Sequence, residues 1–200
     1  MKERPGELQR ELRRIVQALG DQGVAAAVVG GLAVSARAEP RFTRDADLAV
    51  AVLDDLEAER IVRALQHRGY RVLQSLEHLT TRRLATVRLL PPGGGTEGVI
   101  VDLLFASSGI EPEIVAAAEG LELLPGLHLP VAGIGHLLAM KLLSFDPVSR
   151  ATDGQDLVHL LAEATESDLE TCREAIRTIE DRGYHRGRDL PALLHRFRTP

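Results

Sequence analysis

Apolar residues in the N-terminal part of the chain alternate between helical and extended spacing. Leu8, Leu12, Ile15 and Leu19 recur at intervals of three or four residues, which predicts an amphipathic helix that ends at the glycines following it. Short apolar runs predict strands at 24–29, 47–52, 82–90 and 99–105, and a hairpin across 121–129.

Two further helices are predicted between these extended segments. One covers 32–38 and stops before Pro40, because a residue that precedes proline disfavours the helical conformation. The other covers 54–67, with Asp54 as its N-cap and Gly69 just beyond its end.

From Gly133 onward the pattern is helical only. Helices are predicted at about 134–144, 154–164, 167–181 and 188–197. The chain therefore predicts an α/β fold of the α+β kind. A small mixed β-sheet flanked by helices occupies residues 1–131, and a C-terminal helical region follows over 132–200.

Composition narrows the classes of protein. Apolar residues make up 44% and charged residues 26% of the 200 positions, which is typical of a globular protein. With no Trp, two Tyr and four Phe, the chain has few aromatic side chains for stacking single-stranded bases. A single cysteine excludes an internal disulfide, and we expect a cytoplasmic protein because neither a membrane helix nor a secretion signal is visible.

The net charge of −5 does not favour indiscriminate binding of nucleic acid, but basic residues gather near the C-terminus. They are Arg182, His185, Arg186, Arg188, His195, Arg196 and Arg198. Two interpretations stay open, a solvated face or a patch that meets a polyanion.

The pair Gly30-Gly31 joins the first predicted strand to a helix. Glycines at such a junction let backbone N–H groups approach a phosphate, with the helix dipole adding to the attraction. A plain tight turn would give the same pattern.

Three aspartates are the candidate metal ligands. Asp45 and Asp47 project to one face of an extended strand because side chains alternate along it. Asp102 interrupts an apolar strand, where an ionised carboxylate needs a cation or another partner. Divalent metal would relieve the repulsion among the three carboxylates, whereas the alternative for Asp102 is an ion pair with an arginine such as Arg88.

These motifs and their order resemble those of the AbiEii/AbiGii-type toxin nucleotidyltransferases, within the DNA polymerase β-like nucleotidyltransferase superfamily. The resemblance rests on Gly-Gly and a helix, Arg-x-Thr-x-Asp-x-Asp at 41–47, the strand-borne Asp102, Lys141 in an apolar helix, and Asp-x-x-Asp at 153–156. Thr152 departs from the family, which often has a basic residue there, and Gly154 is an unfavourable residue within a helix.

The resemblance implies a nucleotidyltransferase core at 1–131 that uses two Mg²⁺ ions, or Mn²⁺. The implied metal ligands are Asp45, Asp47 and Asp102, and the further catalytic residues are Lys141, Asp153 and Asp156. The implied nucleotide-binding residues are Gly30, Gly31, Arg41, Thr43, Arg44, Lys141 and Arg150. Whether Asp153 or Asp156 is the functional acid stays open, and Lys141 could instead be an exposed surface lysine.

The predicted reaction moves a nucleoside monophosphate from an NTP to an acceptor hydroxyl. The resemblance favours RNA as the acceptor, at the 3′ end of tRNA, with the chain as the toxin of a toxin–antitoxin pair and an antitoxin protein as partner. One alternative is a small-molecule acceptor, as in the aminoglycoside-modifying enzymes. Another is a non-catalytic regulatory module that keeps the fold.

Overall fold

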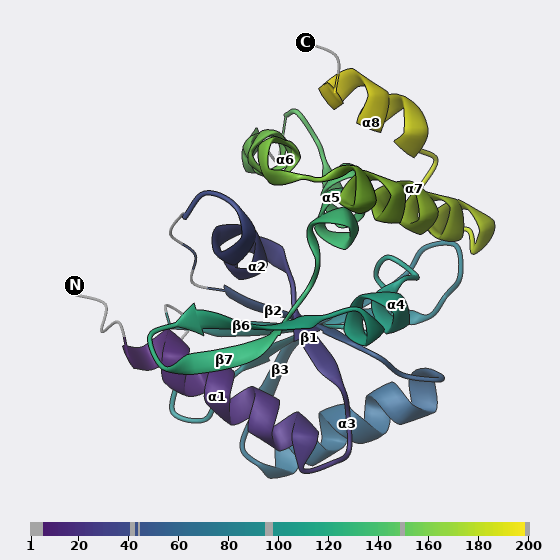
Figure 1. Ribbon diagram of the computed structural model, residues 1–200. Helices are drawn as coiled ribbons and strands as arrows, with labels where there is room; N and C mark the ends of the chain where they lie inside the picture. The colour runs from purple at the N-terminus through teal and green to yellow at the C-terminus, as the bar shows by residue number, and fades with distance from the viewer. Residues whose placement is uncertain (1–5, 41–42, 44, 95–97, 149–150, 199–200) are drawn as a thin grey trace.

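A seven-stranded mixed sheet forms the centre of the computed structural model, which describes all residues except 1–5, 41–42, 44, 95–97, 149–150 and 199–200 (Figure 1). The strands are β1 (Ala26–Val28), β2 (Asp45–Val50), β3 (Arg71–Glu77), β4 (Leu84–Leu90), β5 (Ile100–Leu104), β6 (Glu119–Leu124) and β7 (Leu127–Val131). Their order across the sheet is β3-β4-β5-β2-β1-β7-β6. The β2–β5 and β1–β7 pairs are parallel and the other neighbours are antiparallel.

Helices cover both faces of this sheet. They are α1 (Gly6–Gly20), α2 (Gly30–Arg37), α3 (Asp55–His67), α4 (Glu111–Ala116), α5 (Ile134–Ser144), α6 (Ala151–Glu163), α7 (Glu166–Asp181) and α8 (Leu190–Arg198). Figure 1 shows α1 and α3 on one side, and α2, α4 and the group α5–α8 on the other. None of the helices in the described ranges is long and apolar enough to cross a membrane.

The hydrophobic pattern explains how the helices attach. In α1, Leu12, Ile15 and Leu19 are fully buried, so one stripe of the helix packs on the core as predicted. At the start of α3, the carboxylate of Asp54 accepts a hydrogen bond from the N–H of Glu57 at 2.9 Å, which confirms the predicted N-cap.

The sequence predicted most elements of the fold, with two omissions. The α+β class, the hairpin β6–β7 and the helical C-terminal region are confirmed, while β3 and the short α4 were not predicted. The predicted strand 82–90 begins instead at Leu84, because Arg82 takes a left-handed conformation with φ of 58°.

The unfavourable glycine in α6 has a packing reason. A Cβ atom on Gly154 would lie 3.1 Å from the ring of Phe145, so a larger residue would require that ring to move by a few tenths of an ångström. The last strand of the sheet ends at Val131 and α5 begins at Ile134, next to the predicted division between the core and the helical region.

Candidate active site

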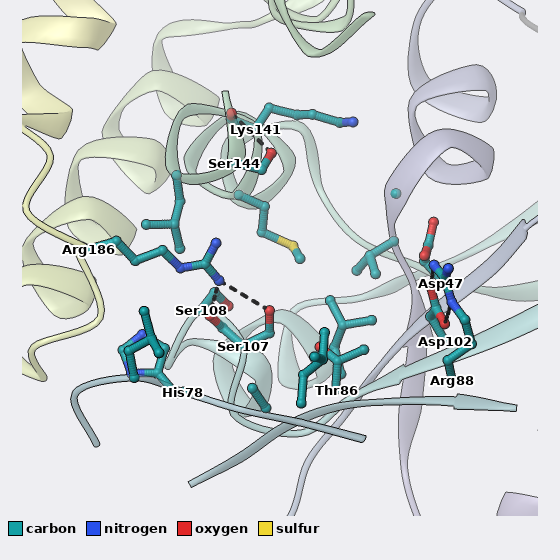
Figure 2. Close-up of a pocket in the computed structure, with 18 of the residues that line it drawn as sticks. Asp47, His78, Thr86, Arg88, Asp102, Ser107, Ser108, Lys141, Ser144 and Arg186 are labelled. Carbon is teal, nitrogen blue, oxygen red and sulfur yellow. Dashed lines mark hydrogen bonds and ion pairs between the residues drawn. The ribbon is translucent and has the colours of Figure 1, made fainter. Parts of the chain in front are cut away.

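A cleft of about 1140 Å³ opens between the sheet, the start of α2, helix α5 and the turn between α7 and α8 (Figure 2). Gly30, Gly31, Thr43 and the three aspartates Asp45, Asp47 and Asp102 all line it, as does Lys141. The structure thus brings together predicted site residues that are far apart in the sequence.

The register of two parallel strands places the carboxylates side by side. Asp47 on β2 is the direct neighbour of Asp102 on β5, and Asp45 lies two residues before Asp47 on the same face. Residues opposite each other on paired strands have Cβ atoms about 5 Å apart, so these side chains share one small region.

Asp102 also forms the ion pair that the sequence left open. Nε of Arg88 donates to its Oδ1 at 2.9 Å, and Nη2 of Arg88 donates to its Oδ2 at 2.7 Å. The carboxylate side chain is only 9% exposed, and this pairing raises the pKa of Arg88. With the side chains in these positions, the described residues contain no group of three or more His, Cys, Asp or Glu placed to hold a metal ion.

The surroundings of the aspartate cluster raise the pKa of Asp47. Burial, followed by the negative charges of Asp102 and Asp45, raises the pKa of Asp47 to about 6. The positive charges of Lys141 and Arg88 oppose that rise without cancelling it. The ionised cluster therefore has too little positive charge around it.

Position 30 requires glycine because of its backbone conformation and because Asp47 lies close to it. Its φ is +63°, a conformation that residues with a Cβ rarely adopt, and a Cβ here would lie 2.0 Å from Oδ2 of Asp47. Helix α2 begins at Gly30 with no side-chain cap at Val29. The amide groups of its first turn therefore lie at the carboxylate end of the cleft with no side-chain acceptor at the N-cap.

Lys141 is held between two aspartates. Its Nζ lies 2.6 Å from Oδ1 of Asp153 and 2.8 Å from Oδ2 of Asp156, and the hydroxyl of Ser144 donates to the other oxygen of Asp153 at 2.9 Å. The Lys141 side chain is only 12% exposed, so the interpretation as an exposed surface lysine is wrong. Lys141 lines the cleft, whereas the two aspartates are not among its lining residues.

Three predicted nucleotide-binding residues, Arg41, Arg44 and Arg150, lie outside the described residues. At the end of the cleft away from the carboxylates lie residues that the sequence did not single out: His78, Ser107 and Ser108 (Figure 2). They follow strands β3 and β5, and no spacing signal in the sequence marks them.

The basic C-terminal stretch does not form one continuous face. Arg182 makes a bidentate ion pair with Glu113, Arg198 pairs with Glu166, and Arg188 donates to a backbone carbonyl just after α5. Arg186, by contrast, lines the cleft beside Ser107 (Figure 2). The stretch therefore divides into arginines that hold the α7–α8 region in place and one that lines the cleft.

Comparisons with known proteins identify a family and similar folds. The family described as "Nucleotidyl transferase AbiEii toxin, Type IV TA system" matches residues 11–199. An antigenic nucleotidyltransferase-like protein from Paracoccidioides brasiliensis is similar in structure, with 18% identity, 96% of this chain and 93% of that chain covered, and a TM-score of 0.53. ANT(2")-Ia in complex with adenylyl-2"-tobramycin has 14% identity, coverage of 95% and 96%, and a TM-score of 0.51. At these identities the two structures show the fold alone, and no curated protein matches the chain.

Proposed function

The chain belongs to the AbiEii family of nucleotidyltransferase toxins, and we propose that it transfers a nucleoside monophosphate from an NTP to a hydroxyl of RNA with the help of divalent metal. The observation that carries this proposal is the pairing of Asp47 with Asp102 in the parallel register of β2 and β5, with Asp45 on the same face. We further propose the 3′ end of tRNA as the acceptor and an antitoxin as the cellular partner, on the basis of the family.

The carboxylate cluster fits a hard divalent cation. Its donors are all oxygens, which suit Mg²⁺ or Mn²⁺. Burial and, after it, the charges of Asp102 and Asp45 raise the pKa of Asp47, and a cation would relieve this repulsion. Asp45 and Asp47 would hold the metal, joined by Asp102, whose second partner Arg88 offsets part of the charge. When bound, the metal would lower the pKa of the attacking hydroxyl and neutralise phosphate oxygens.

The start of α2 would bind the phosphates of the NTP. Gly30 and Gly31 expose the amide groups of the first turn beside Asp47, and the positive end of the helix dipole attracts anions. Thr43 lines the same end of the cleft. The triphosphate would therefore be oriented with its α-phosphorus at the carboxylates.

Lys141 would neutralise the charge that develops on the leaving pyrophosphate. Asp153 and Asp156 bind its ammonium group and do not line the cleft. We therefore assign them as positioning residues for Lys141 rather than as acids that touch the substrate. This arrangement fixes a flexible lysine side chain in one direction before the substrate arrives.

Incubation of the protein with Mg²⁺, each α-labelled NTP and total RNA tests the proposal. We expect label to enter RNA with the wild type and not with Asp45→Asn, because one carboxylate of the cluster is lost. Glu59→Gln, on the exposed face of α3, is the matched control and should behave as the wild type. Equal labelling by the wild type and Asp45→Asn would overturn the catalytic role of the cluster.

A further inference from the structure

The turn between α7 and α8 is built to present Arg186 to the cleft. Arg182 on one side of it pairs with Glu113, and Arg188 on the other side donates to the carbonyl of Phe145, so both ends of the turn are fixed to the core. Arg186 itself has a φ of +54°, a conformation that is strained for a residue with a side chain. Its Nη2 donates to the carbonyl of Ser107 at 2.8 Å.

His78 adds a buried donor at the same end of the cleft. Its Nδ1 accepts a hydrogen bond from the N–H of Thr81 at 3.3 Å, so the hydrogen of the neutral ring is on Nε2. The residue is only 5% exposed, its ring lies 4.4 Å from that of Tyr184, and its Nε2 has no hydrogen-bond partner. Burial, with the charge of Arg186 acting in the same direction, lowers the pKa of His78 and keeps the ring neutral.

Two carboxylates lie near these donors. Glu111 is fully buried behind the loop, where its Oε1 accepts from the N–H groups of Ser107 and Ser108 and from the Ser108 hydroxyl, so three donors already offset its charge. Glu77 lines the cleft from the exposed strand β3.

The length of chain between Asp102 and Ser107 limits the distance between the two ends of the cleft. Asp102 and Ser107 are five residues apart, a span of at most about 17 Å in extended backbone. That length corresponds to no more than about five nucleotides of a stacked strand. Leu104, Leu137 and Met140 line the cleft as well and offer apolar surface for bases.

We propose that Arg186 and His78 form an acceptor subsite, which binds a backbone phosphate of a single-stranded RNA whose 3′-hydroxyl lies at the carboxylates. The inference rests on the proposed function and deepens it by assigning where the acceptor binds. Figure 2 shows Arg186, Ser107 and His78 at the opposite end of the cleft from Asp47 and Asp102. The NTP triphosphate already has the start of α2 and Lys141 at the carboxylate end.

The test compares Arg186→Gln and Arg186→Gly with a matched control, Arg177→Gln, which removes the same charge from the exposed face of α7. The probe is a short 5′-fluorescein-labelled single-stranded RNA with a free 3′-hydroxyl, and its dissociation constant is measured by anisotropy over a series of salt concentrations. NTP binding is measured separately on each variant without RNA.

We expect Arg186→Gln to weaken RNA binding by at least about tenfold, since a charge-assisted phosphate contact is lost, and to reduce the slope of log affinity against log salt by about 0.7. NTP affinity should stay at the wild-type value, and Arg177→Gln should bind RNA as the wild type does. Arg186→Gly should lose RNA binding while its melting temperature equals or exceeds that of the wild type, because glycine relieves the strained φ.

Three results of the binding measurements would overturn the subsite: unchanged RNA binding in Arg186→Gln, an equal loss of NTP affinity, or no RNA binding by the wild type. Equal loss of NTP affinity would assign Arg186 to the triphosphate instead. A different result would overturn the proposed function alone. If RNA binding depends on Arg186 but no label is transferred from any NTP, the subsite is supported and the transfer activity is refuted. Transfer to a phosphate-free acceptor with full activity in Arg186→Gln keeps the activity and overturns the subsite.

Discussion

The Asp47 carboxylate lies among negative charges, so we expect Asp47→Asn to stabilise the protein in the absence of divalent metal. Burial and the neighbouring aspartates raise its pKa from 3.8 to about 6 in the folded protein. A raised carboxyl pKa means that the folded state binds the proton more tightly than the unfolded state. Ionisation of Asp47 therefore destabilises the fold, and asparagine removes that ionisation while keeping the shape.

The size of the effect follows from the shift. A rise of about two pKa units corresponds to about 3 kcal/mol at 1.36 kcal/mol per unit, and it is fully present only above the folded pKa. At pH 7.5 the variant should be more stable than the wild type by up to about 3 kcal/mol. The difference should shrink as the pH falls through 6 and reach about 0.5 kcal/mol at pH 4, where Asp47 is protonated in the folded state.

Urea unfolding between pH 4 and pH 7.5 in the presence of a chelator measures this difference, since urea adds no ionic screening. Asp21→Asn is a control of opposite sign. Hydrogen bonds from Gln17 and Arg68 lower the pKa of Asp21, so its loss should destabilise at neutral pH. Mg²⁺ should then stabilise the wild type more than Asp47→Asn. A variant that is less stable than the wild type at pH 7.5, or a difference that is independent of pH, would refute the reasoning.

Three further predictions concern the same cleft. Lys141→Met should lower the free energy of unfolding by about 3–5 kcal/mol, because Asp156 stays buried without its cation. Adding Asp156→Asn should recover much of that loss in urea melts. If the effects of the two substitutions on stability are simply additive, the positioning role is contradicted. Gly30→Ala should abolish labelling of RNA, because the new Cβ clashes with a carboxylate and φ is positive; full activity would show that the α2 start can shift. Asp102→Asn should abolish transfer and lower the free energy of unfolding by less than about 2 kcal/mol, because Arg88 is 41% exposed and its guanidinium can reach water. Arg88→Met should lower the free energy of unfolding more. Equal activity in Asp102→Asn and the wild type would exclude Asp102 from the site.

The periodicity of apolar residues was sufficient to predict the regular elements that bury a continuous face. Helix α3 shows this well, since Asp54 caps it and Ile61 and Leu65 are buried as the spacing predicts. Strand β3 was not predicted because it lies at the edge of the sheet, where Leu73 and Leu76 remain about half exposed and no alternation of buried and exposed positions develops. This exposed edge strand depends on its neighbour β4 more than on the pattern of its own residues.

Within the cleft, the amino-acid order is sufficient to predict relations between residues that are close along the chain. Asp45 and Asp47 share a face because strand side chains alternate, and Gly30 marks the start of a helix. Those facts need only bond geometry over a few residues, so they can be read from the order of residues alone.

Contacts between groups that are distant along the chain depend on how the helices and strands pack. The parallel register of β2 and β5 places Asp102 beside Asp47, although 55 positions separate them in the chain. The packing of α6 on α5 holds Lys141 between two aspartates, and the anchored α7–α8 turn brings Arg186 to the cleft. Ion pairs of this kind form where the packing of buried apolar surfaces brings two elements together. The sequence of one segment does not show which residue of a distant segment will be its partner.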